Sequence, residues 1–178
     1  MSTRTRFLSP KVYAVARFIV VFWALGNLVA FAIFWGSAAL DIDQPDWLQV
    51  SFGEVDITGP LAAVLFTLQA LLQALLVVAL WHGVKALRRL EHPVEGYRDL
   101  ILHLARFATA LFVYSIGATF VSVVQASHAA AQESGQFTLV LTINSDRISL
   151  LIMCFVLYCV CNALRMASEA VEENQSFL

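Results

Sequence analysis

The segment WHGVKALRRLEHPVEGYRDLILHLAR, residues 81–106, is the one long basic stretch in the middle of the chain. The two halves that it joins share one plan, which is an apolar run, a loop and a second apolar run. Pro93 and Gly96 interrupt the segment, and such residues end helices. The segment therefore predicts two helices that run in opposite directions and meet at a short turn.

The composition places the chain in a membrane. Hydrophobic residues make up 60% of the 178 residues and charged residues 13%, against about 45–50% and about 25% in soluble domains. A water-soluble domain of this size still exposes about a third of the surface of its unfolded chain. So much apolar surface is better covered by lipid. The net charge of -2 carries little information, because the charges are sorted by region, and a large basic face for nucleic acid is not indicated.

The apolar runs are long enough to cross a hydrocarbon core of about 30 Å as helices. We expect one integral membrane domain over residues 1–178, an all-α fold with four transmembrane helices. The expected parts are spans at 18–40, 60–84, 100–124 and 147–165, extracellular loops at 41–59 and 125–146, a cytoplasmic middle segment at 85–99 and a tail at 166–178.

Both loops contain alternating apolar residues, which is the period of a strand. Leu48, Val50 and Phe52 alternate in the first loop, and the range 137–143 alternates in the second. We therefore expect short β-strands in the two loops, and a small sheet if these strands pair.

Positive charge is distributed unequally across the expected membrane. Lys and Arg number four in the N-terminal arm, five between Trp81 and Arg106 and one in the tail, against one, Arg147, in the two loops. Positively charged loops stay in the cytoplasm. We expect both termini and the middle segment to be cytoplasmic.

No Asp, Glu, Lys or Arg lies between the expected helix ends, which argues against an ion-coupled pump. The polar residues singled out at membrane depth are Asn27, Gln69, Gln73 and Asn162. Gln69 and Gln73 share a helix face, and amides of this kind commonly bond between helices. The alternative is that they line a pore or bind a ligand.

Histidines and cysteines are the remaining groups that could carry chemistry. His82 and His103 flank the middle segment at similar depth, so a bis-histidine haem site is one hypothesis. Histidines at helix ends more often lie at the membrane interface. The cysteines, all in the last apolar run, are interpreted as packing residues rather than a metal or redox site: Cys154, Cys159 and Cys161. We expect no metal, no cofactor and no enzyme activity, since no catalytic motif is present.

The layout resembles the bacterial membrane proteins of the domain-of-unknown-function 2975 family (DUF2975). The likeness is strongest in TLVLTINSDRISLLIMCFVLYCVCNALRMASEAVEEN, residues 138–174, and includes ALRRLE at 86–91 and LHLARFA at 102–108. Many members have an aromatic-hydroxyl pair before the third helix, where this chain reads EHPVEGYRDL, so a contact made there is in doubt. The resemblance implies a bacterial inner membrane protein without assigned activity. Genes of the family often neighbour small helix-turn-helix regulators, which implies signalling or regulation.

We expect a non-enzymatic sensory or regulatory protein whose cytoplasmic helix ends dock a protein partner, such as a small DNA-binding regulator, without direct contact to nucleic acid. The residues expected to dock the partner are Lys85, Arg88, Arg89, Arg98, Glu169, Glu172, Glu173 and Asn174. Two alternatives stay open. One is an oligomeric pore or small-molecule transporter, and the other is a haem or thiol redox protein. The partners of the chain would also include the lipid bilayer and further copies of itself.

The expected orientation makes a first testable prediction. In a cysteine-free variant, a single cysteine in the first loop, Ser51→Cys, should react with a membrane-impermeant maleimide on intact cells. A single cysteine in the tail, Ser176→Cys, should react only after the membrane is permeabilised. Reaction at position 176 on intact cells would show that the tail lies outside.

Overall fold

The computed structural model describes residues 10–40, 60–91, 97–136, 138–141 and 145–176. These residues form four helices, which are α1 (Pro10–Ala39), α3 (Pro60–Glu91), α4 (Tyr97–Ser134) and α5 (Ser145–Ser176). Each helix contains a stretch long and apolar enough to cross a membrane. The predicted all-α class with four spans is confirmed at this level, and the chain is a multi-pass membrane protein.

Within these described ranges there is no β-strand. The strand expected over 137–143 is not found where it can be checked, because residues 138–141 have no regular secondary structure. The backbone N–H of Val140 instead donates to the Ser127 hydroxyl of α4 at 3.0 Å. The alternation in the first loop lies outside the described residues.

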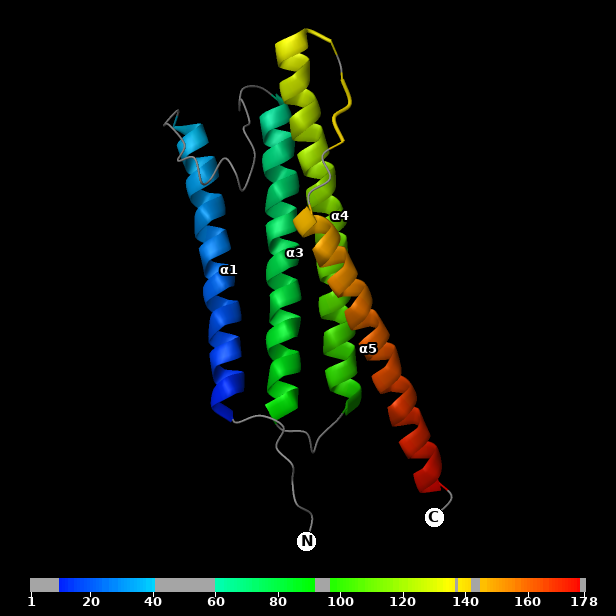
Figure 1. Ribbon diagram of the computed structural model, residues 1–178. Coiled ribbons are helices and arrows are strands. Elements are labelled where there is room, and N and C mark those ends of the chain that lie inside the picture. Colours follow the sequence, from blue (N-terminus) through cyan, green and yellow to red (C-terminus); the bar gives the residue numbers. More distant parts are fainter. Residues whose placement is uncertain (1–9, 41–59, 92–96, 137, 142–144, 177–178) are drawn as a thin grey trace.

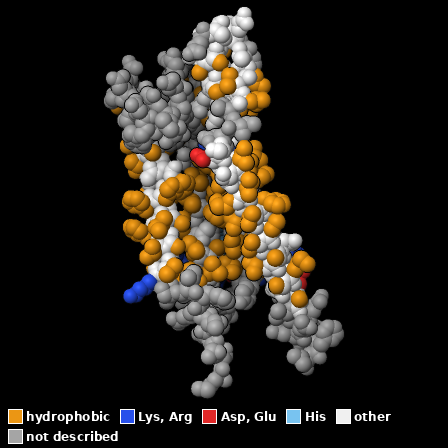
Figure 2. All heavy atoms as spheres, in the orientation of Figure 1, with side chains coloured by type: hydrophobic (Ala, Val, Ile, Leu, Met, Phe, Trp, Pro, Cys, Tyr) orange, Lys and Arg blue, Asp and Glu red, His pale blue; other side chains and the backbone are white. Residues whose placement is uncertain are grey.

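The helices are arranged around the antiparallel pair of α3 and α4. α1 packs on α3 and α5 packs on α4, so α1 and α5 lie on opposite sides of the central pair (Figure 1). The exposed surface is apolar, as Figure 2 shows for one face, and it includes Phe18 and Phe22, which are 70% and 68% exposed. Such surface is suited to lipid contact.

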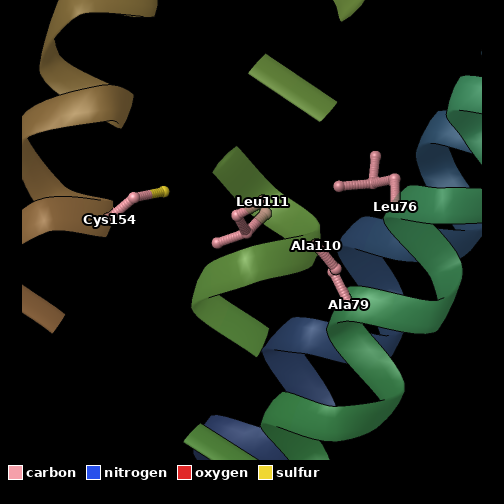
Figure 3. Packing of buried hydrophobic residues seen from close by; sticks show 5 residues of the cluster. All are labelled: Leu76, Ala79, Ala110, Leu111 and Cys154. Atoms are coloured by element: carbon pink, nitrogen blue, oxygen red, sulfur yellow. The ribbon is translucent and has the colours of Figure 1, made fainter. Parts of the chain in front are cut away.

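Small side chains let α3 and α4 approach closely. Ala79 of α3 and Ala110 of α4 are buried in one cluster with Leu76, Leu111 and Cys154, the last contributed by α5 (Figure 3). Gly83 and Gly117 serve the same purpose. A Cβ atom at Gly83 would lie 3.3 Å from the ring of Phe107, and one at Gly117 would lie 2.5 Å from a methyl group of Leu72. Small residues are enriched at helix contacts in membranes because lipid supplies no hydrophobic drive for association.

α1 packs against the other helices mainly near its C-terminal end. Phe34 and Trp35 are buried against Leu65 of α3 and Val121 of α4. The Trp35 ring also meets Phe66 edge to face, with centroids 5.1 Å apart, a preferred aromatic geometry. These contacts fix the end of α1 against the start of α3.

α4 is longer than the span expected from sequence. α4 continues to Ser134, ten residues into the expected loop at 125–146, and Gly135 ends it with a φ of 67° and an N–H donated to the Ala131 carbonyl at 3.0 Å. Glycine is favoured at this position because it adopts positive φ without strain. α5 begins beside the middle of α4 and leans away from it toward the C-terminus (Figure 1).

The close contact at Gly117 makes a second testable prediction. Gly117→Leu should push α3 and α4 apart, because overpacking costs about 1–3 kcal/mol. Gly26→Leu on α1 is the matched control, since nothing lies within 4 Å of its added Cβ. Thermal unfolding in detergent should show a lower midpoint for Gly117→Leu only, and equal midpoints would contradict the packing described above.

Candidate functional site

The end of the molecule that carries most of the charged residues is the first candidate site. We call it the basic end: the start of α1, the end of α3, the start of α4 and the end of α5 lie there (Figure 1). The turn between α3 and α4 falls between Glu91 and Tyr97, as the sequence predicted from Pro93 and Gly96. The expected docking residues with described side chains all lie near this end.

A pair of histidines links α3 to α4 at the basic end. The Nδ1 atoms of His82 and His103 are 3.1 Å apart, and the ring centroids are 5.3 Å apart. One Nδ1 must donate and the other accept, so the two nitrogens cannot both carry a proton in this contact. The two histidines therefore form a hydrogen bond between α3 and α4.

The same geometry bears on the haem hypothesis. Bonds from imidazole to a metal are about 2 Å long, so two ligands on opposite sides of one iron would lie about 4 Å apart. The two Nδ1 atoms are bonded directly to each other at 3.1 Å. They would have to separate before both could bind iron through these atoms.

The structure divides the expected basic docking residues into three kinds. Arg89 is paired with Asp99 across the α3–α4 turn at 3.0 Å. The Lys85 ammonium lies 5.1 Å from the centroid of the Trp81 ring, within the range of a cation–π contact. Arg88 and Arg98 are exposed, and neither contacts a carboxylate among the described residues.

The acidic docking residues lie on α5. Glu169 accepts a hydrogen bond from Arg165 of its own helix at 2.9 Å, and both side chains are exposed. Such surface pairs contribute little to stability. The backbone of α5 continues through Glu172, Glu173 and Asn174, whose side chains lie outside the described residues. α5 leans away from α4 toward its C-terminus (Figure 1), and among the described side chains no ion pair joins α5 to Arg88, Arg89 or Arg98.

The polar residues expected at membrane depth have different surroundings. Gln69 accepts a hydrogen bond from the Trp35 indole N–H at 2.9 Å, so it joins α3 to α1. The Asn27 amide donates to the Trp23 carbonyl of its own helix at 3.0 Å. Asn162 is exposed on α5. Only Gln69 of these three makes a described bond to a second helix.

Gln73 of α3 is buried. Its Oε1 has no hydrogen-bond partner among the described residues, and the same holds for the buried hydroxyl of Ser115 on α4. Leu72 of α3 lies against Gly117 of α4, so Gln73 and Ser115 lie at about the same level of the two helices. Sequence alone does not show that these two polar groups share a level.

The cysteines are all free. Cys154 and Cys161 are buried and Cys159 is exposed. Cys154 belongs to the cluster that joins α3, α4 and α5 (Figure 3). No group of three or more metal-binding side chains occurs in the part of the chain that the structure describes.

Two contacts between α4 and α5 were missed by the sequence analysis. The hydroxyl groups of Thr109 and Tyr158 are hydrogen bonded; because Thr109 donates to the Ala105 carbonyl, Tyr158 is the donor. The Arg147 guanidinium lies 5.9 Å from the centroid of the Tyr114 ring. The expected bounds put Arg147 at the outer start of the fourth span, and nothing in the sequence shows how far α5 is shifted along α4.

The bond between Trp35 and Gln69 makes a third testable prediction. Trp35→Phe should leave the Gln69 carbonyl oxygen unpaired and lower stability by about 1 kcal/mol, within the range measured for bonds between membrane helices. A double-mutant cycle with Gln69→Leu isolates this bond. The coupling should be about 0.5–1.5 kcal/mol in reversible unfolding, and strictly additive effects would show that the bond contributes nothing.

No known protein family, curated protein or solved structure matches this chain. The resemblance to DUF2975 remains a prediction from the sequence. The functional proposals below therefore depend on the geometry of the described residues.

Proposed function

We propose that the chain is a sensory or regulatory membrane protein that docks a protein partner at its basic end. The observation that carries this proposal is the state of Arg88 and Arg98. Both are exposed and neither is paired with a carboxylate among the residues described. An acidic surface on a cytoplasmic partner would supply the missing charges.

The lengths of the helices support a position outside the lipid. α3 has 32 residues and α4 has 38, so they measure about 48 and 57 Å at 1.5 Å per residue, against about 30 Å for the hydrocarbon core. Arg98 precedes Arg106 by eight residues on α4, which is about 12 Å along the helix. If Arg106 lies near the interface, Arg98 reaches water.

The Arg89–Asp99 ion pair gives this surface a defined shape. It joins the end of α3 to the start of α4 at 3.0 Å, on either side of the turn. Arg88 and Arg98 are the chain neighbours of these two residues. A partner would thus meet two arginines at adjacent helix ends that the ion pair links.

The distribution of charge supports cytoplasmic termini, as the positive-inside rule predicts, and the resemblance to DUF2975 is our reason for proposing a bacterial inner membrane. Of the residues on which the two alternatives depend, Gln69 is bound to Trp35, and the histidines of the haem hypothesis are bound to each other through their Nδ1 atoms. Gln73 is the pore-lining candidate without a described partner. A small DNA-binding regulator remains our proposed class of partner.

Charge reversal makes a fourth testable prediction. A photo-crosslinking residue at position 90, an exposed position near the end of α3, should capture the partner in native membranes, and the identified partner can then be purified. Arg88→Glu or Arg98→Glu should weaken its binding to the purified protein about tenfold, because each change replaces an attraction by a repulsion of about 1 kcal/mol or less.

Lys11→Glu is the control, since Lys11 is an exposed cation at the start of α1, which lies at the basic end of the molecule. It should leave the affinity unchanged. Wild-type affinity in both arginine variants, or an equal loss in Lys11→Glu, would overturn the proposed docking surface. Arg89 is avoided because its reversal would also break the Arg89–Asp99 pair.

A further inference from the structure

We propose that the seam between α3 and α4 binds the headgroup phosphate of an anionic phospholipid at a site formed by His82, Lys85, His103 and Arg106. The two helices contribute equivalent pairs, His82 with Lys85 and His103 with Arg106, each three residues apart. Residues with this spacing are neighbours on a helix surface. The direct bond between the histidines, with 3.1 Å between the Nδ1 atoms, brings the two pairs together.

The site has an excess of positive charge. Lys85 and Arg106 are close enough for their charges to act on both imidazole rings. Asp99 is the acidic group that acts on His103, and its carboxylate is bound by Arg89 at 3.0 Å. No carboxylate in the described ranges pairs with Lys85 or Arg106. An anion from outside the chain would balance these charges.

The histidine pair supplies a further donor for this anion. The ring whose Nδ1 accepts the shared hydrogen bond must carry its own proton on Nε2, because a neutral imidazole has one N–H. That Nε2–H is not used in the bond between the rings. Whichever histidine is the acceptor, one ring N–H is left unused by the bond between the rings and would donate to a phosphate oxygen.

The depth of the site favours a lipid phosphate over a soluble one. Trp81 is 58% exposed and lies one turn from Lys85, whose ammonium sits over its ring at 5.1 Å. Exposed tryptophans of membrane proteins concentrate at the level of the headgroups. Basic pockets between transmembrane helices bind anionic headgroups. The site is distinct from Arg88 and Arg98 and does not depend on the proposed protein partner.

Lipid selectivity tests this site and gives the fifth prediction. Full-length protein in nanodiscs of phosphatidylcholine with a minor fraction of phosphatidylglycerol should retain phosphatidylglycerol after extraction, as counted by native mass spectrometry. Lys85→Gln/Arg106→Gln should lose this preference about tenfold or more, since each nearby charge contributes to binding. Arg88→Gln/Arg98→Gln removes the same number of charges and should retain the preference.

Further measurements distinguish lipid binding at this site from binding of soluble phosphate and from an effect of general surface charge. Inorganic phosphate in excess should not displace the lipid, and displacement would identify a site for soluble phosphate instead. If the Arg88/Arg98 variant lost the preference for phosphatidylglycerol equally, the preference would come from general surface charge, and the proposed site would be wrong. If the double variant does not elute as a single species, the single variants Lys85→Gln and Arg106→Gln are compared, and unchanged preference in both would also overturn it. Lys85→Arg/Arg106→Lys keeps both charges and should keep the lipid.

Discussion

The close contact between α3 and α4 is the interaction on which the other helices depend. An apolar side chain gains little free energy when it moves from contact with lipid to contact with another helix. Helices in a membrane therefore associate through packing and hydrogen bonds. Ala79 and Ala110 are buried where the two helices meet, and glycines on both helices lie directly against Phe107 and Leu72. α1 then adds to the α3 side and α5 to the α4 side. Neither outer helix has an equally extensive contact of its own.

Polar bonds define the positions of the helices along this apolar framework. The histidine pair fixes α3 against α4 near the basic end, Trp35 and Gln69 fix α1 against α3, and Thr109 and Tyr158 fix α4 against α5. Among the described residues, each pair of packed helices thus has at least one side-chain hydrogen bond between them, and α3 and α4 are also joined by the Arg89–Asp99 ion pair. Bonds of this kind specify a register, which apolar packing alone leaves free to slide.

The sequence predicts the number of helices and some of their limits, because hydropathy and turn residues act locally, but α1 begins earlier and α4 ends later than expected. The turn at Pro93 and Gly96 and the start of α3 at Pro60 are examples. The sequence could place His82 and His103 at similar depth, but not show that their nitrogens meet. It could not show that Gln69 is bonded to Trp35, 34 residues away, or that Arg147 lies beside Tyr114. Both depend on how helices are shifted and rotated against each other, and apolar periodicity is weak when lipid and protein neighbours are equally apolar.

The attachment of α1 near one end has a consequence for how the chain can change in evolution. Phe34 and Trp35 are its buried residues among those described, and they contact α3 and α4. Between Val12 and Val29, most large apolar side chains of α1 are exposed and would face lipid. Lipid chains accommodate apolar side chains of different shapes about equally well. Drift among Leu, Ile, Val and Phe should therefore be free in the first half of α1. Near Trp35, the size and the hydrogen bonding of the side chains should be constrained. The two parts of α1 should therefore differ in their rates of substitution.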